Sequence, residues 1–400
     1  MLSNAQSNII KATVPVLETG GEALTTHFYR TMLAEYPEVR PLFNQAHQAS
    51  GAQPRALANG VLMYARNIDR LEALGPLAAQ IVSKHVALQV LPGHYPIVGT
   101  CLLRAIREVL GAEIATDAVI DAWGAAYQQL ADLLIGAERD AYDQLAQAPG
   151  GWRGARAFRV VRKVPESAEI TSFYLEPVDG RPVVRFRPGQ YIGLKLIVDG
   201  EEIRRNYSLS APPDGQSYRI SVKREPHGRA SGFLHDRVSE GATLELFPPA
   251  GEFTLGTSDR PIALISGGVG ITPTLAMAEA ALEAGRPVRF IHYARHADVH
   301  AFGDLLDTWS ARHAHFKAYV VYERHDATAA RQPDATGRPD AAQLKRWLPA
   351  APDFDAYFLG PKPFMVCIRR MLRDLGLPDE RIRYEFFGPA QALDADSGQQ

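Results

Sequence analysis

The sequence predicts a multidomain chain of three successive units: an all-α unit, an antiparallel β-barrel, and an α/β unit with a parallel sheet. Up to about residue 148, apolar residues recur at helical spacing. From about residue 156 the chain consists of short β-branched runs separated by Gly and Pro. After Pro261, apolar strands alternate with helical stretches. A length of 400 residues also exceeds that of one ordinary domain.

The composition is that of a soluble globular protein, with 46% apolar and 22% charged residues. The net charge of −2 and the lack of basic clusters give no reason to expect binding to nucleic acid or to anionic membranes. No apolar run is long enough to span a bilayer, and the N-terminus lacks the pattern of a secretory signal. The two cysteines lie in different halves and are expected to be free thiols. We therefore expect a cytoplasmic protein.

Five helices are expected in the first unit. Gly20 and Gly21 on one side and Pro37 on the other bracket the first of them, which contains Phe28 and Tyr29. The other four are expected at residues 53–68, 76–90, 95–110 and 116–145, with Thr116 as the N-cap of the last.

The two later units differ in their pattern. Residues 158–252 alternate as strands do, and Pro188-Gly189 and Asp214-Gly215 supply turns, which favours an antiparallel barrel. Expected strands at 262–265, 288–293, 319–322 and 356–359 alternate with helices at 273–284 and 363–375, as in a parallel sheet. The expected units are residues 1–148, 155–257 and 258–392, with a linker at 149–154 and a flexible tail at 393–400.

Two polar residues stand in apolar helical stripes. His85 continues a stripe with Leu77, Ile81 and Leu88, and Glu138 falls at the next position of a stripe on the last helix. A lone buried histidine is commonly a core residue bonded to a carbonyl group, and a buried carboxylate needs a partner or the edge of a site. Each signal alone leaves these alternatives open.

Several stretches together resemble the globin domain of bacterial flavohaemoglobins over nearly all of residues 1–148. They are His27-Phe28-Tyr29, Pro41-Leu42-Phe43-Asn44, Gln53-x-x-x-Leu57, Lys84-His85, Tyr95-Pro96-Ile97-Val98-Gly99 and Trp123-x-x-x-Tyr127. The resemblance implies that His85 is the proximal metal ligand of a b-type haem, held without covalent attachment because Cys-x-x-Cys-His is absent.

The same resemblance assigns further roles around this haem. Phe43 would pack on its face, Tyr29 and Gln53 would be the distal polar groups, and Leu57 would wall the pocket. On the proximal side, Glu138 and Tyr95 would keep the imidazole oriented and electron-rich.

A glycine cluster follows the expected strand at 262–265. It reads Gly267-Gly268-Val269-Gly270-Ile271-Thr272-Pro273, with Thr272 expected as a helix N-cap and Pro273 in the first turn. Glycines let the backbone approach a pyrophosphate whose charge the helix N-terminus meets, although such a cluster can also be only a tight turn. It is not the Gly-x-Gly-x-x-Gly fingerprint, so a generic dinucleotide-binding assignment does not follow.

Two more motifs resemble ferredoxin–NADP⁺ reductase-like flavoproteins: Pro188-Gly189-Gln190-Tyr191 and Arg205-Asn206-Tyr207-Ser208. The resemblance implies that Arg205 and Ser208 bind flavin phosphate and ribitol and that Tyr207 stacks on the isoalloxazine; the guanidinium fork matches phosphate geometry. Ser231 would lie at the helix start that receives the FAD pyrophosphate. The remaining implied cofactor-binding residues are Tyr191 and Asn206 for FAD, Gly268, Val269, Gly270, Ile271, Thr272 and Pro273 for NAD(P)H, and Phe386, Phe387, Gly388 and Pro389 in a segment covering the flavin.

Two positions depart from this family. Leu359 stands where the family usually has Cys beside the nicotinamide, and Phe386 stands where it often has Cys. Lys84 and Glu385 match residues that oppose each other across the domain interface and tune the haem and flavin potentials. The alternative is that they are two ordinary surface charges.

The function implied is nitric oxide dioxygenation, converting NO and O₂ to nitrate with electrons from NAD(P)H through FAD to haem b in a monomer. Two alternatives remain: an alkyl hydroperoxide or general haem/flavin reductase, and a globin that stores or senses O₂ or NO with its own reductase. The choice between NADH and NADPH stays open: Arg295 could meet a 2′-phosphate, but the nearby His296 and Asp298 leave the local charge unclear. The resemblance itself favours NADH.

Overall fold

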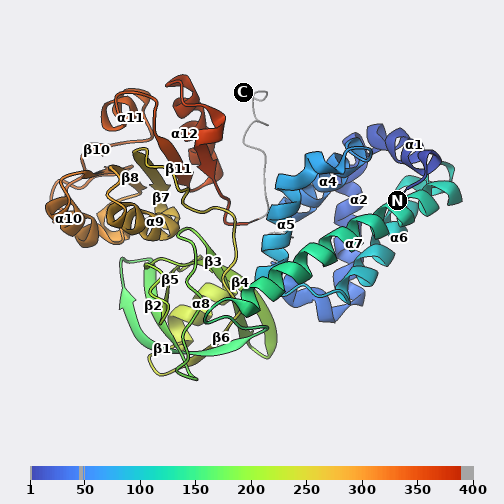
Figure 1. Cartoon of the computed structure of the whole chain (residues 1–400), viewed down its shortest axis with the longest axis horizontal. Coiled ribbons are helices and arrows are strands. Elements are labelled where there is room, and N and C mark those ends of the chain that lie inside the picture. The colour runs from blue at the N-terminus through green and yellow to red at the C-terminus, as the bar shows by residue number, and fades with distance from the viewer. Residues whose placement is uncertain (1, 45–47, 49, 389–400) are drawn as a thin grey trace.

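The computed structural model describes residues 2–44, 48 and 50–388. It contains a helical unit, a curled antiparallel sheet and a parallel sheet, in the predicted order (Figure 1). The helical unit lies on one side of the molecule and the two sheets on the other, with helix α5 on the side that faces the sheets. The predicted fold class is therefore confirmed. Pro389 and the expected tail at residues 393–400 lie outside the described residues.

The helical unit runs to Gln147 and matches four of the predicted helices. Its elements are α1 (Asn4–Ala12), α2 (Val14–Glu35), η1 (Pro37–Leu42), α4 (Ala52–Arg66), η2 (Leu71–Leu74), α5 (Gly75–Leu88), α6 (His94–Ile114) and α7 (Asp117–Gln147). Thr116 caps α7 as predicted, since its side chain accepts from the Val119 amide. Helix α1 was not expected from the sequence; a capping box between Ser3 and Gln6 begins it.

The prediction that Gly20 and Gly21 precede a helix is wrong, because α2 begins at Val14 and runs through both. Glycine costs about 1 kcal/mol relative to Ala in a helix interior. The cost is offset here by close packing, since a Cβ on Gly21 would lie 3.4 Å from the Cβ of Ala58 on α4. The small residue lets α2 and α4 pack closely.

The antiparallel sheet has the order β4-β3-β6-β1-β2-β5. The strands are β1 (Arg156–Pro165), β2 (Ile170–Pro177), β3 (Tyr191–Val198), β4 (Glu201–Ser208), β5 (Tyr218–Lys223) and β6 (Thr243–Leu246), and helix α8 (Arg229–Arg237) follows β5. A bridge between Leu209 and Ile220 connects the two outer strands, so the sheet curls into the predicted barrel.

The parallel sheet has the order β10-β9-β8-β7-β11-β12. Its strands are β7 (Ile262–Gly267), β8 (Val288–Ala294), β9 (Phe316–Tyr322), β10 (Ala335–Thr336), β11 (Asp355–Leu359) and β12 (Ile382–Tyr384). The helices and 3₁₀ turns between them are η3 (Gly268–Gly270), α9 (Ile271–Glu283), η4 (Ala297–Val299), α10 (Gly303–Arg312), α11 (Ala341–Trp347), α12 (Lys362–Asp374) and η5 (Asp379–Arg381). The order reverses at β7, and ligands bind at such switch points beyond the carboxyl ends of the strands.

Helix α9 begins at Ile271 with Gly270 as its N-cap, so the prediction of Thr272 as N-cap is wrong. Thr272 lies inside the first turn, and its hydroxyl donates to the Val269 carbonyl at 3.0 Å. Among the described helices, none is long and apolar enough to cross a bilayer.

Two histidines lie inside the parallel-sheet unit. His292 and His300 are 1% and 7% exposed, and their ring centroids are 5.1 Å apart. Hydrogen bonds join His292 Nδ1 to Ser266 Oγ at 2.8 Å and His300 Nδ1 to the Tyr322 hydroxyl at 2.9 Å. Burial lowers the pKa of His300 to about 4 and holds the pKa of His292 well below its ordinary value.

A base whose pKa is lowered on folding stabilises the fold fully above its unfolded pKa and loses that contribution as the pH falls. We predict that the stability of the intact chain falls between about pH 6.5 and 4, with His300 contributing roughly 2–3 kcal/mol across this range. Urea unfolding at several pH values should show a shallower fall for His300→Phe, whereas His325→Phe, at an exposed position, should keep the wild-type slope. Equal slopes in wild type and His300→Phe would contradict the assignment.

Candidate functional site

Three helices bring together the residues predicted for the proximal side. His85 on α5 lies with its Nδ1 2.6 Å from Oε1 of Glu138 on α7 and 3.3 Å from the hydroxyl of Tyr95 on α6. The Tyr95 hydroxyl donates to the same Glu138 oxygen at 2.6 Å. Glu138 is 2% exposed, whereas the His85 side chain is 32% exposed. The carboxylate predicted to need a partner therefore has two.

This hydrogen-bond network fixes the proton positions. Burial, followed by the bond to Glu138, raises the pKa of Tyr95 far above its ordinary value, so the phenol remains a donor. Because Glu138 Oε1 accepts from both partners, the proton of a neutral His85 lies on Nδ1 and the lone pair on Nε2. Tyr127 braces the arrangement by donating to the Tyr95 carbonyl at 2.6 Å.

The predicted distal residues also lie together. Tyr29 on α2 is buried, hydrogen-bonds with Gln53 on α4, and lies with its ring centroid 5.5 Å from that of Phe43. Gln48 donates to Gln53 Oε1 at 3.0 Å. Burial raises the pKa of Tyr29 above its ordinary range, which keeps its proton available for donation. The bond from Gln53 lowers this pKa in turn, as a donor to the phenol oxygen does.

Two observations on the helical unit fit a bound haem. Across residues 2–44, 48 and 50–388 no group hydrogen-bonds the Nε2 of His85, so this ring nitrogen is available to a metal. Several apolar side chains pack on the helical core yet remain partly exposed, so apolar surface is available to a flat apolar group. They are Phe43, Leu57, Val61, Leu88, Val90, Ile97 and Val98.

Strand β4 carries the residues predicted for flavin binding. Arg205 donates to the Arg204 carbonyl at 2.7 Å and to Asn44 Oδ1 at 3.3 Å, and among the described residues no carboxylate pairs with it. Burial lowers the pKa of this guanidinium, so an anionic partner would be favourable. Ser208 is buried, Tyr207 packs on the barrel core, and Asn206 is exposed.

Two other residues predicted for FAD have additional contacts. Tyr191 is buried and packs in one cluster with Val86 and Ala87 of α5, so it links the barrel to the helix that carries His85. The Ser231 hydroxyl, in the first turn of α8, accepts from the Glu225 amide at 3.1 Å and donates to the Gly228 carbonyl at 3.2 Å. Ser231 therefore also shapes the turn that begins this helix.

The glycine turn after β7 lies against the segment predicted for the nicotinamide. A Cβ on Gly270 would lie 2.4 Å from the Leu359 carbonyl oxygen and 3.3 Å from the Gly360 nitrogen, so only glycine permits this approach. Gly268, Val269 and Gly270 form η3, and Ile271, Thr272 and Pro273 follow in the first turn of α9. The turn ends at a helix N-terminus, which suits a pyrophosphate.

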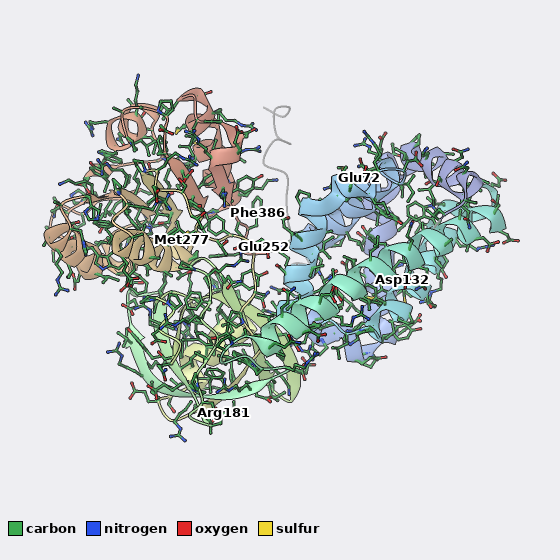
Figure 2. The ribbon with its side chains drawn as sticks, viewed as in Figure 1. Glu72, Asp132, Arg181, Glu252, Met277 and Phe386 are labelled. Atoms are coloured by element: carbon green, nitrogen blue, oxygen red, sulfur yellow. The ribbon has the colours of Figure 1, made fainter. Side chains whose placement is uncertain are left out.

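The C-terminal segment reaches α5. Lys84 Nζ donates to the Gly388 carbonyl at 2.7 Å, and Lys84 lies within electrostatic reach of Glu385. Burial raises the pKa of Glu385 to about 7, Glu252 adds to the rise, and Lys84 opposes it. Phe386 is partly buried with its ring 6.0 Å from that of Tyr384, and Phe387 is 49% exposed. Figure 2 shows Glu252 and Phe386 on the side of the sheets that faces the helical unit.

Four residues at this contact were missed from the sequence. Ser83 donates to Glu252 Oε1 at 3.0 Å, and Arg204 and Gly193 lie against the end of α5. The one sequence feature that could have indicated this contact is the position of Arg204, directly before Arg205 of the flavin motif. Arg295, considered for a 2′-phosphate, forms an ion pair with Glu169 of the β1–β2 connection.

Comparison with known proteins identifies the family. Residues 26–134 match the globin family, residues 157–255 the oxidoreductase FAD-binding domain, and residues 264–370 the oxidoreductase NAD-binding domain. The chain is 67% identical over 395 residues to a flavohemoprotein of Pseudomonas aeruginosa, covering 99% of this chain and 100% of the relative. A flavohemoprotein of Burkholderia sp. is 68% identical over 396 residues, covering 98% and 100%. The chain belongs to the flavohaemoprotein family.

Solved structures agree with this membership. The flavohemoglobin from Malassezia yamatoensis, solved with bound FAD and haem, matches with a TM-score of 0.84 at 28% identity, covering 97% of this chain and 100% of that one. The FAD/NAD-binding domain of nitric oxide dioxygenase from Vibrio cholerae matches with a TM-score of 0.55 at 36% identity, covering 59% and 100%. The three-unit architecture is therefore shared over nearly the whole chain.

We predict that Glu138→Gln lowers the affinity for haem. Tyr95 and His85 both donate to the Glu138 carboxylate, and a neutral amide in its place makes His85 a poorer metal ligand. Haem should leave the protein on the order of tenfold faster, and the iron–histidine stretching frequency should fall. Transfer of haem to excess apomyoglobin and resonance Raman spectroscopy would measure the two effects. Glu108→Gln removes a carboxylate that pairs with His27 at the surface and should change neither; a Glu138→Gln protein with wild-type values would contradict the role.

Proposed function

We propose that the chain is a nitric oxide dioxygenase that uses haem b, FAD and NAD(P)H. The observation that carries the proposal is a combination within one chain. The helical unit holds a tyrosine–glutamine pair and a carboxylate-bound histidine, and a reductase packs against the histidine's own helix. When bound, FAD accepts hydride from NAD(P)H and releases single electrons, and haem is the place where NO, O₂ and one electron become nitrate.

On the distal side, Tyr29 acts as a neutral donor toward negative charge that develops on oxygen during the reaction. Gln53 holds the phenol in place through the hydrogen bond described above. Leu57 and Phe43 line the site with apolar surface and limit the access of water, which strengthens a hydrogen bond made inside it.

On the proximal side, His85 binds the metal through Nε2 while Glu138 accepts from Nδ1. The negative carboxylate makes the imidazole a stronger electron donor than a carbonyl partner would. Tyr95 donates to the same oxygen and so fixes the orientation of Glu138. This arrangement favours oxygen chemistry over reversible storage.

In the reductase, Arg205 and Ser208 bind the flavin phosphate and ribitol, with Asn206 beside them, while Tyr207 and Tyr191 contact the ring system. Ser231 and the start of α8 bind the pyrophosphate of FAD. The segment from Gly268 to Pro273 binds the pyrophosphate of NAD(P)H. Phe386, Phe387 and Gly388 cover the flavin, and Lys84 and Glu385 adjust the potentials at the boundary. The chain is proposed to act as a monomer in the cytoplasm, where NAD(P)H is available.

We predict that NO is consumed rapidly at an electrode in air with NADH, that nitrate is the product, and that Tyr29→Phe slows this consumption on the order of 100-fold. The matched control is Tyr36→Phe, which removes a hydroxyl at the end of the same helix and should behave as wild type.

The outcome can also separate the alternatives. If NO persists while NADH and O₂ are consumed, the reductase assignment holds and the dioxygenase assignment is wrong, and turnover with an organic hydroperoxide should then be measured. Slow nitrate formation together with tight, slowly released O₂ would favour storage or sensing.

A further inference from the structure

The end of helix α5 is attached to the barrel through its backbone carbonyls. Gln89 caps the helix in the left-handed conformation, and Arg204 on β4 donates through Nη1 to the Leu88 carbonyl at 2.6 Å and to the Gln89 carbonyl at 3.3 Å. The last carbonyls of a helix lack partners within the helix and carry partial negative charge. A guanidinium at this position therefore satisfies two acceptors and balances the helix dipole.

Arg204 is itself held in place. Its Nε donates to Glu202 Oε1 at 2.7 Å, and its guanidinium carbon lies 5.3 Å from the centre of the Phe247 ring. Three different contacts thus restrain one side chain between the barrel and the helix. Because Arg204 is restrained in this way, it keeps the end of α5 at a set position relative to β4.

Gly193 on β3 lets the two backbones touch. A Cβ at this position would lie 2.0 Å from the Ala87 carbonyl oxygen, 3.2 Å from the Ala87 carbonyl carbon and 3.0 Å from the Phe247 ring. No side-chain atom fits between the helix and the strand. Gly193 also pairs with Asn206 in the β3–β4 ladder, next to the residues predicted to bind flavin.

We propose that Arg204 and Gly193 form a clamp that sets the position of the haem-binding helix relative to the flavin-binding strand and thereby the rate of electron transfer between them. Arg204 is followed directly by Arg205, and His85 lies one turn before the clamped carbonyls, so the clamp connects both binding sites through short stretches of rigid backbone. Both clamp members are positioning residues. The inference rests on the proposed route of electrons from flavin to haem.

The test uses the intact holoenzyme without NO or O₂. NADH is mixed with the oxidised protein, and absorbance follows flavin reduction and haem reduction as separate phases. The variants are Gly193→Ala, which inserts one methyl group between the backbones, and Arg204→Leu, with Arg204→Lys as the conservative replacement. The matched controls are Gly20→Ala, whose Cβ would meet no atom within 4 Å, and Arg181→Leu, at an exposed position on the far end of the barrel (Figure 2).

We predict that Gly193→Ala and Arg204→Leu slow haem reduction on the order of tenfold, because each change moves α5 relative to β4 and electron transfer depends on the separation and orientation of the two sites. Flavin reduction by NADH, ferricyanide reduction and O₂ binding by the dithionite-reduced haem should remain at wild-type values, which shows that both halves are intact. Arg204→Lys should recover part of the rate, and both controls should match wild type.

Wild-type haem reduction in both clamp variants would overturn the proposal. An equal loss in flavin and haem reduction would also overturn it, because it would place the defect in flavin binding. Because the experiment uses no NO, it measures electron transfer alone. Its result therefore neither supports nor contradicts the dioxygenase assignment.

Discussion

Helix α5 contacts two partners at once, the other helices of its own unit and the reductase, and the proposed link between the two halves depends on both contacts. Its His85 side chain is bound to the Glu138–Tyr95 pair inside the helical unit, while Lys84, Ala87 and Leu88 contact the reductase. A helix restrained from both sides cannot shift toward one partner without losing contacts to the other. The position of the metal ligand is therefore tied to the position of the flavin-binding strand.

The polar interactions around α5 differ in strength according to their burial. Glu138 is nearly inaccessible to water, and one of its oxygens accepts from two donors. Removing either donor would cost this buried oxygen a hydrogen bond that water could not replace. Glu385 is partly buried, and burial raises its pKa to about 7, so that its charge changes close to neutral pH. Far from α5, by comparison, the Arg181 side chain is 75% exposed, and its ion pair with Asp179 contributes little. The interactions that matter for function are thus the enclosed ones on either side of α5.

Much of the fold and part of the site were predictable because they depend on local pattern. The spacing of Leu77, Ile81 and His85 placed the histidine in an apolar helical stripe, and the resemblance to flavohaemoglobins gave it a role as metal ligand. Alternation predicted the strands of the antiparallel sheet, and apolar strands alternating with helices predicted the parallel sheet. The clamp was not predictable, since the closeness of Gly193 to Ala87 exists only after residues far apart in sequence have packed. The interior position of Gly21 in α2 has the same origin: tertiary packing against α4 overrides the preference of glycine for helix ends.

The central claim is that electrons pass from flavin to haem within one chain, across the contact made by α5. The most direct measurement is the rate of haem reduction by excess NADH without O₂, in stopped flow, over a wide range of protein concentration. The account predicts a first-order rate that does not change with protein concentration and a haem that becomes fully reduced. A rate that rises in proportion to protein concentration, or a haem that stays oxidised beside a reduced flavin, would contradict it.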